Sequence, residues 1–279
     1  MAAAETPSNW QARLALEFCV KSDKTVLTRR EHQGPLAFQK VLYPEGASIA
    51  HALLVHPPGG IAGGDALTIG MNVRAGARVL ATTPGATKWY RSNGQPATQD
   101  VSVVQGAGSL VEYFPQENIL FNACDAQYRL EVCLEEDAVF AGWDITALGR
   151  RARGESWSSG RWGQAIRVRQ AGRVRFQERL NLAADDLRTR SKTGFSNQPV
   201  FGAFFVVGRT PPMELVTACQ ALSVSSPGIA GVSGLEWGMA VRYLGESPEQ
   251  AQAYFEHVWS KLRPWYANTE MRRPRIWAT

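Results

Sequence analysis

Cysteine and histidine are scarce in this sequence, with four of each among 279 residues. No two cysteines form a C-x-x-C pair, so the sequence indicates neither a zinc ribbon nor a redox dithiol. The histidines form no H-E-x-x-H motif, and His51 and His56, five residues apart, would point to opposite faces of one strand. These absences argue against a dedicated high-affinity metal site. They leave His56 as a candidate only for a weak site assembled in space.

Long hydrophobic runs and targeting segments are also missing. The longest apolar run lies near residues 201–207, far short of the roughly 18 residues that a membrane helix needs. The N-terminus has no basic start followed by an apolar stretch, so it does not resemble a signal peptide. We therefore expect a cytoplasmic, reduced protein that does not enter a membrane, with about residues 1–12 disordered.

No block of a single charge sign occurs, although the chain is basic. Lys and Arg number 30 against 25 Asp and Glu, a net charge of +5, and the excess is spread along the chain. Basic residues with interleaved aromatics, at 88–91 and 150–162, leave open an alternative function, that of a basic all-β nucleic-acid-binding protein. No nucleic-acid-binding fold signature accompanies them. Since most of the basic residues are arginines, which pair well with carboxylates, an acidic protein partner is the simpler interpretation.

Signatures of phosphate binding and of nucleophilic catalysis are absent as well. The glycine-rich stretch HPPGGIAGGD, residues 56–65, is followed by a strand pattern rather than by Lys-Ser/Thr and a helix, so it is not a P-loop. It is predicted to be a strand-to-strand turn in which glycines supply positive φ. No G-x-S-x-G elbow occurs, and neither Cys124 nor Cys133 has a histidine near it in sequence. A hydrolase therefore has little support.

The dominant positive signal is alternation of apolar and polar residues with period two. Residues 67–73 and 128–134 follow it, as strands with one buried face do. Residues 166–176 read as a hairpin around a turn at 170–173. Short turns containing glycine or proline separate such runs. The chain is therefore predicted to be mainly β over about residues 12–190.

Helical signals are confined to the C-terminal third. Ser247 begins a capping box with Pro248 at the first helical position, an apolar stripe follows, and Pro264 is expected to end this helix. A weaker helix is predicted over 210–222, with Thr210 as its cap and one or two strands between the helices, over 234–244. The predicted buried face of the weaker helix consists of Leu215, Val216, Cys219 and Leu222.

Three carboxylates, Glu117, Asp144 and Glu178, stand in otherwise apolar stretches. A buried carboxylate is costly unless it is paired or coordinates a cation. One interpretation is an ion pair with an arginine, for which Arg179 is the sequence neighbour of Glu178. The other is that acidic groups inside a basic protein line a path of hard ligands for a divalent cation.

Seven stretches of the chain, taken in order, resemble the urease accessory protein UreD (UreH) family. The resemblance runs from about residue 34 to the last residue, and the ordered combination is highly specific. The stretches are GPLAFQKVLYPEG (34–46), HPPGGIAGGD (56–65), TTPGATKWYRS (82–92), PQENILF (115–121), GWDITALGR (142–150), ER (178–179) and RPRIWAT (273–279).

The resemblance implies a single domain, residues 1–279, of layered or β-helical strands with two helices in the C-terminal third. It also implies a scaffold or chaperone rather than an enzyme. Such a protein acts with UreF and the GTPase UreG, docks on apo-urease and helps deliver nickel received through UreE. UreF would bind near the C-terminal elements, and a dimer would form through UreF.

No tightly bound cofactor is expected, because Ni²⁺ would only pass through the protein along an internal polar path. Weak, multiple sites suit such passage better than one tight cage. The expected lining residues are Asp65, Asp144 and Glu178, with Thr87 as a neutral oxygen ligand and His56 and Glu117 as additional candidates.

Overall fold

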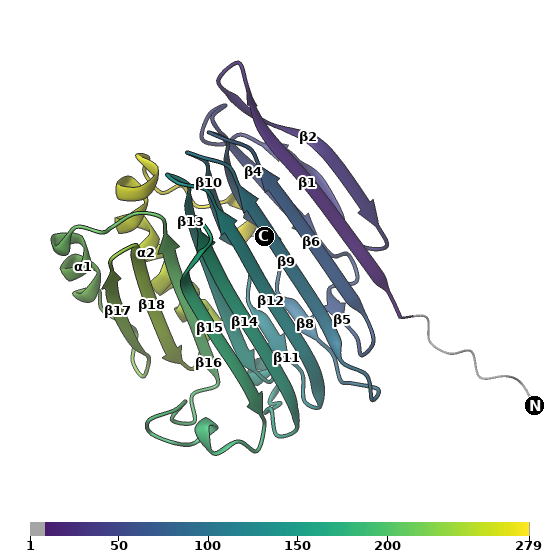
Figure 1. Ribbon diagram of the computed structural model, residues 1–279. Coiled ribbons are helices and arrows are strands. Elements are labelled where there is room, and N and C mark those ends of the chain that lie inside the picture. The colour runs from purple at the N-terminus through teal and green to yellow at the C-terminus, as the bar shows by residue number, and fades with distance from the viewer. Residues whose placement is uncertain (1–8, 279) are drawn as a thin grey trace, which may run out of the picture.

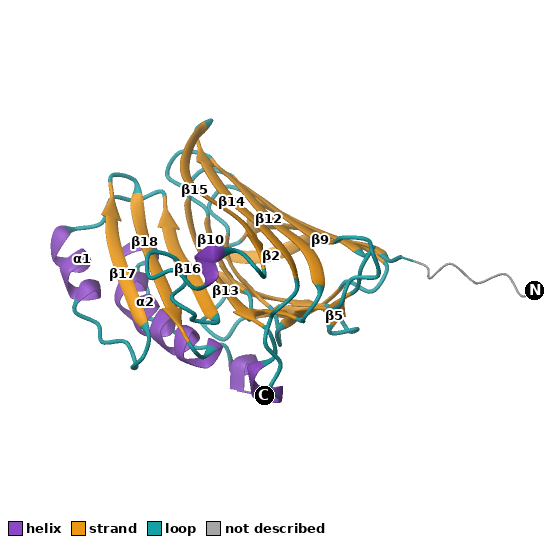
Figure 2. Cartoon of the chain, turned by 90° about the horizontal axis from the view of Figure 1, so that it is seen from below, coloured by secondary structure: helices purple, strands orange, loops and turns teal. Residues whose placement is uncertain are grey.

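Two β-sheets face each other, and the helices lie outside them (Figure 1, Figure 2). The structure, a computed structural model, describes residues 9–278. Sheet A has seven strands in the spatial order β15-β14-β12-β9-β6-β1-β2. Its strands are β1 (Gln11–Lys21), β2 (Lys24–Gln33), β6 (Ala66–Val73), β9 (Ala97–Gln105), β12 (Cys124–Leu134), β14 (Gly160–Gln170) and β15 (Arg173–Ala183).

Sheet B has eleven strands, eight of them in the spatial order β17-β18-β16-β13-β10-β7-β4-β3. These eight are β3 (Ala37–Leu42), β4 (Ile49–Val55), β7 (Arg78–Thr82), β10 (Leu110–Phe114), β13 (Val139–Leu148), β16 (Val200–Val207), β17 (Ile229–Leu235) and β18 (Gly238–Gly245). Three short strands continue the sheet around one side of the molecule: β5 (Gly60–Ile61), β8 (Thr87–Trp89) and β11 (Asn118–Leu120).

The chain winds between the sheets as a β-solenoid of about four turns. Each of the first three turns runs from sheet B through a short side strand to sheet A, as β4–β5–β6, β7–β8–β9 and β10–β11–β12. The fourth runs from β13 through the 3-10 helix Arg151–Arg153 to β14. Equivalent strands of successive turns pair in parallel. The prediction of a mainly β fold of layered or β-helical strands is therefore confirmed.

Antiparallel strands cover both ends of the solenoid, where a bare turn would expose unpaired backbone groups. At the first turn, β1 pairs with β6 in parallel and with β2 in antiparallel fashion, and β3 pairs with β4. At the last turn, β15 pairs with β14, and β16, β18 and β17 extend sheet B from β13. Of residues 1–12, predicted to be disordered, residues 1–8 lie outside the described residues, and β1 begins at Gln11.

The alternating sequence patterns place the core between the sheets. The strands predicted at 67–73 and 128–134 lie within β6 and β12, and the hairpin predicted at 166–176 is formed by β14 and β15. β12 buries every second residue, including Tyr128, Leu130 and Val132. β13 is buried at every position, because its other face packs against the long C-terminal helix.

Two α-helices, α1 (Met213–Gln220) and α2 (Pro248–Ala267), cover the outer face of sheet B (Figure 2). The Ser247 side chain accepts a hydrogen bond from the Gln250 amide at the start of α2, as the capping box predicts. The predicted apolar stripe is buried against sheet B, and the two strands between the helices are β17 and β18. The remaining helices are the short 3-10 segments Leu187–Thr189 and Arg275–Ala278.

Two predictions about helix ends are wrong. Pro264 does not end α2, which continues to Ala267 and is capped by Asn268 in the left-handed conformation. Proline removes one backbone donor, but burial of the side chains of Arg263 and Tyr266 holds this last turn on the sheet. Thr210 does not cap α1: its hydroxyl donates to the carbonyl of Glu236, and the residue before the helix is Pro212.

Candidate functional site

Two columns of polar side chains follow the solenoid axis through its interior. Gln99, Tyr128 and Gln164 stand in register on the neighbouring strands β9, β12 and β14. Thr87, Asn118 and Thr146 stand in register on β8, β11 and β13. Neighbouring strands in each column belong to successive turns and lie about 4.8 Å apart. Each residue of a column therefore comes from a different turn. Polar groups therefore continue along three successive turns of an otherwise largely apolar interior.

Asp144 lies where the two columns meet and is 2% exposed. Its carboxylate accepts hydrogen bonds from Asn118 Nδ2 at 2.9 Å, Thr146 Oγ1 at 3.1 Å and Gln164 Nε2 at 2.6 Å. Trp89 Nε1 donates to Asn118 Oδ1, which fixes the orientation of that amide. Burial raises the pKa of Asp144 to about 6, although the three hydrogen bonds oppose the rise. No arginine neutralises this carboxylate among residues 9–278.

Trp162 Nε1, on β14, is buried and has no hydrogen-bond partner among the described residues. The ring of Trp162 stacks in parallel with that of Tyr128, whose hydroxyl interacts with the hydroxyl of Tyr113. Burial raises the pKa of Tyr113 and of Tyr128, and the charge of Asp144 contributes to both rises. Since buried polar groups are normally hydrogen-bonded, this part of the interior is suited to water or a hydrated ion.

A cleft of about 580 Å³ opens beside Asp144, between β15 of sheet A and the β16–β18–β17 end of sheet B. We call it the Asp144 cleft. Glu178 also lines it and pairs with Arg242 of β18, with Nε and Oε1 2.8 Å apart. Arg179 is not this partner, because successive residues of β15 point to opposite faces. The structure therefore brings the predicted residues Asp144 and Glu178 together at one end of the polar columns.

A second cleft, of about 310 Å³, opens at the other end of the columns. We call it the His56 cleft; its polar lining consists of His56, Thr83, Thr87, Lys88 and Gln99. Burial lowers the pKa of His56, although the nearby Asp65 opposes the shift, so the ring is neutral near pH 7. Its Nε2 atom is buried and has no partner among the described residues. Two predicted residues, His56 and Thr87, thus meet here.

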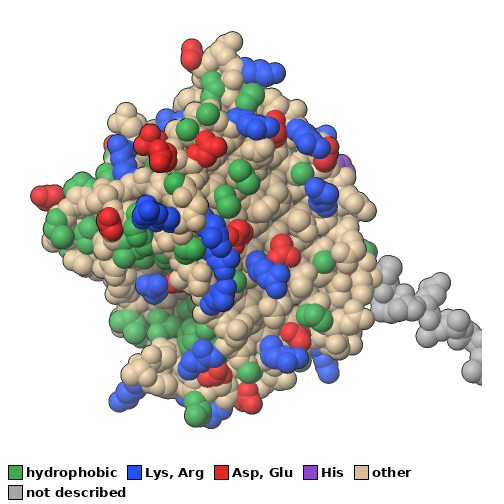
Figure 3. Space-filling view, viewed as in Figure 1, with side chains coloured by type: hydrophobic (Ala, Val, Ile, Leu, Met, Phe, Trp, Pro, Cys, Tyr) green, Lys and Arg blue, Asp and Glu red, His purple; other side chains and the backbone are tan. Residues whose placement is uncertain are grey.

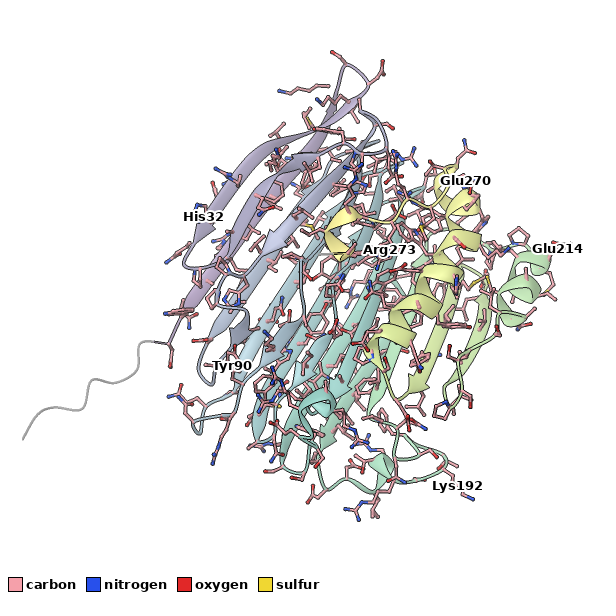
Figure 4. All side chains as sticks on the ribbon, turned by 180° about the vertical axis from the view of Figure 1, so that it is seen from behind. His32, Tyr90, Lys192, Glu214, Glu270 and Arg273 are labelled. Atoms are coloured by element: carbon pink, nitrogen blue, oxygen red, sulfur yellow. The ribbon has the colours of Figure 1, made fainter. Side chains whose placement is uncertain are left out.

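Asp65 braces the glycine-rich turn. Its two carboxylate oxygens accept hydrogen bonds from the amides of Trp10 at 2.9 Å and Ala62 at 3.0 Å. In the same turn, a Cβ at position 60 would meet the ring of Tyr90 at 2.4 Å, so that a larger residue there would displace this ring. Figure 4 labels Tyr90. The stretch 56–65 is thus a turn from β4 to β6, as predicted, with the short strand β5 inside it.

Glu117 lies away from both clefts, in the loop between β10 and β11. Its backbone carbonyl accepts a hydrogen bond from the amide of Thr87. Burial raises the pKa of its carboxyl, and Glu249 at the start of α2 contributes to the rise. The structure therefore does not bring Glu117 together with Asp144 and Glu178.

Apart from Thr87, sequence reasoning missed the neutral members of the columns. Gln99 and Gln164 occupy inward positions of strands on which inward neighbours such as Val101 and Ile166 are apolar. The signal that could have found them is a polar residue at a strand position that the alternating pattern predicts to be buried. Asn118 has no such signal, because its strand is only three residues long.

No group of three or more His, Cys, Asp or Glu side chains that could hold a metal ion occurs among residues 9–278. The carboxylate, amide and hydroxyl oxygens of the columns are instead spread along the axis. Oxygen ligands of this kind suit hard divalent cations, and their dispersal suits passage rather than storage. In the same part of the chain, no helix has the length and hydrophobicity to cross a membrane.

Comparison with known proteins gives one consistent result. A model of the family described as UreD urease accessory protein matches residues 11–278. A urease accessory protein UreD of Methylobacillus flagellatus is 46% identical over 277 residues, which cover 99% of this chain and 97% of that protein. The corresponding protein of Nitrosococcus oceani is 40% identical, with coverage of 98% and 92%.

Proposed function

This chain belongs to the UreD family of urease accessory proteins, and we propose that it serves urease assembly as a scaffold and as a conduit for nickel. Proteins of this family are non-catalytic and take part in assembly of the urease metallocentre. In the proposal, the chain works in the cytoplasm with UreF and the GTPase UreG and docks on apo-urease. Nickel arrives through UreE and is cargo rather than a resident cofactor.

UreF binds, in this proposal, at the C-terminal elements. Met213 at the start of α1 supports this placement, because it is a large apolar side chain that is 73% exposed. Exposed apolar groups are common at protein interfaces. A dimer of the complex would then form through UreF.

The polar interior is the proposed path of the ion. Hydrated Ni²⁺ passes between the His56 cleft and the Asp144 cleft along the columns of amide, hydroxyl and phenol groups. The ion exchanges part of its water for these oxygen atoms, as ions do in selective pores. Trp162 Nε1, which has no partner among the described residues, can donate a hydrogen bond to the water that remains.

Asp144 is the strongest attraction on this path, because it is a buried carboxylate without a cationic partner in the described structure. Glu178 follows it towards solvent and is neutralised by Arg242. Asp65 and Glu117 have weaker support as ligands: the oxygens of Asp65 are occupied by backbone amides, and Glu117 lies outside both clefts. The single observation that carries the proposal is the in-register continuity of the polar columns from one cleft to the other.

Replacement of the two acids tests the proposal. Asp144→Leu and Glu178→Leu are each produced with UreF, UreG and apo-urease, and the nickel content of the purified urease and the composition of the complex are measured. We expect less nickel in urease while the complex assembles normally, because only the path is changed. Asp100→Leu and Glu31→Leu, the same changes at exposed positions of sheet A, serve as matched controls. Wild-type nickel content with both interior variants would reject the conduit.

A further inference from the structure

The outer face of sheet A carries a notch that the nickel path does not use. It has a volume of about 440 Å³ and lies over β14, between β12 and β15. Its floor consists of Gly163 and Ala165, the smallest outward-facing residues of β14. The side chains of β12 and β15 form its walls, because both strands carry large polar residues in register with Gly163 and Ala165.

The strand register arranges the notch in rows across β14. Arg129 and Arg179 stand on opposite sides of Ala165. Two strand spacings separate them, roughly 9–10 Å between backbones. In the next row, Gln127 and Asn181 stand on opposite sides of Gly163. The register therefore places two arginines and two amides on the strands that flank one gap. The guanidinium of Arg129 lies 3.8 Å from Asp100 of β9, on the other side of β12.

Both arginines are available to a ligand. Arg179 is exposed and takes part in no ion pair within the described part of the chain. Arg129 is 68% exposed and has only a long contact with Asp100, at 3.8 Å. Figure 3 shows further Lys and Arg side chains on this face of the molecule, with Asp and Glu side chains among them. The positive charge at the notch is therefore only weakly compensated.

We propose that this notch binds an acidic, extended segment of a protein partner, with a carboxylate side chain held between Arg129 and Arg179. Arginine donates paired hydrogen bonds to carboxylates in a planar fork. An extended segment presents alternate side chains on one face about 6.7 Å apart, which matches the spacing of the rows along β14. The neighbouring side chain of the segment then reaches the amides of Gln127 and Asn181.

The notch favours a protein over a nucleic acid. Glu131 lines one wall, and Asp100 lies beside Arg129, so a continuous phosphate backbone would meet negative charge. The only aromatic residue that lines the notch is Tyr128, and its ring is buried in the interior. Base stacking, which single-stranded nucleic acids need, therefore has no platform. A free monovalent anion would gain little from two exposed arginines, whereas several linked carboxylates bind as one ligand.

Fluorescence anisotropy of the full chain with a labelled peptide of alternating Glu and Ser tests the proposal at low ionic strength. We expect Ala165→Leu, which fills the notch without a change of charge, to weaken binding about tenfold, because the carboxylate loses its paired hydrogen bonds. The double variant Arg129→Gln/Arg179→Gln should weaken it at least as much. The controls are matched changes elsewhere on sheet A, Ala15→Leu and Arg29→Gln/Arg30→Gln. Their affinity for the peptide should stay within about twofold of the wild-type value.

Three outcomes would overturn the proposal. One is equal binding of the peptide by Ala165→Leu and Ala15→Leu, which would indicate attraction by net charge alone. Another is that the wild-type chain binds a peptide of alternating Gln and Ser as tightly as the peptide of alternating Glu and Ser. The third is binding of single-stranded DNA that is tighter than binding of the peptide, together with notch variants that weaken DNA binding more than peptide binding. If Ala165→Leu fails to fold by circular dichroism, the two charge variants decide between the notch and net charge.

Discussion

At the scale of single residues, Asp144 shows how one side chain is held in an unfavourable state. A fully buried carboxylate would normally be paired with a cation, but here amides and a hydroxyl supply its hydrogen bonds. Neutral donors keep the carboxylate in place without cancelling its charge. The charge thus remains available to a cation, and its cost appears as the raised pKa.

This raised pKa predicts a pH-dependent stability difference between the wild type and Asp144→Asn. Burial raises the pKa of Asp144 from 3.8 to about 6, so folding favours the protonated form. Its stabilising contribution is full below pH 3.8 and is lost as the pH rises through 6. A shift of this size corresponds to about 3 kcal/mol. Urea unfolding from pH 4 to 7 should therefore show Asp144→Asn gaining stability relative to the wild type.

The exposed Asp100→Asn, which removes a carboxylate from the surface of sheet A, is the matched control. A difference between wild type and Asp144→Asn that does not change with pH would show that the carboxyl is not perturbed in the folded protein.

At the scale of elements, the C-terminal helix is attached to sheet B by a buried ionic cluster. Arg263 of α2 is 0% exposed and contacts Glu112 of β10 at 2.8 Å and Glu45 at 2.9 Å. Tyr266 and Trp259 also donate to Glu112. The segment after α2 folds back over the sheet, where Arg273 lies (Figure 4). Residues far apart in sequence thus hold one helix in place.

Loss of the buried cation should be costly. We expect Arg263→Met to lower the free energy of unfolding by about 3–5 kcal/mol, because it leaves two buried carboxylates without their partner. Arg273→Met removes an exposed pair with Glu256 and should cost no more than about 1 kcal/mol. Chemical unfolding compares the two variants. Equal losses would contradict a structural role for the buried cluster.

The same cluster makes the attachment of α2 to sheet B less stable at low pH. Burial alone would raise the pKa of Glu45, but hydrogen bonds from His51 and Arg263 lower it to about 2. A depressed pKa contributes stability above the unfolded value of 4.5, which is lost as the pH falls from 4.5 towards 2. This acid loss should be smaller in Arg263→Met, since one of the groups that lower the pKa is gone.

At the scale of the whole molecule, the solenoid stacks equivalent strands of successive turns, so that residues in register form lines along its axis. Each of the last three turns contributes one residue to each polar column, so the proposed path is a series of steps rather than a single site. A series has a property that independent sites lack: a block at any step stops passage. The parallel stacking of the turns therefore matters as much as any one ligand.

This arrangement predicts that two blocks act no more strongly than one. Gln99→Leu near the His56 cleft and Asp144→Leu near the other cleft should each lower nickel transfer to urease, and the double variant should match the more severe single variant. Thr98→Leu, on the outer side of the same strand as Gln99, is the control. Effects that multiply in the double variant would indicate two separate routes, and wild-type transfer with Gln99→Leu would remove the first column from the path.

Much of the fold follows from the sequence alone. Alternation with period two predicted β6, β12 and the β14–β15 hairpin, and capping with an apolar stripe predicted the start and face of α2. These features are local, because the strand and helix periods are visible within a few residues. The ordered motifs also identified the family, and the scarcity of cysteine and histidine argued against a metal cage.

Tertiary structure alone decided which side chains meet. The stacking of turns aligns Gln99, Tyr128 and Gln164, which are far apart in the chain and individually ordinary. The packing of sheet A against sheet B gave Glu178 the partner Arg242 rather than its neighbour Arg179, and helix packing carried α2 past Pro264. The physical reason is that local periodicity fixes only which face of a strand is buried. Register, stacking and long-range ion pairs depend on contacts between distant segments.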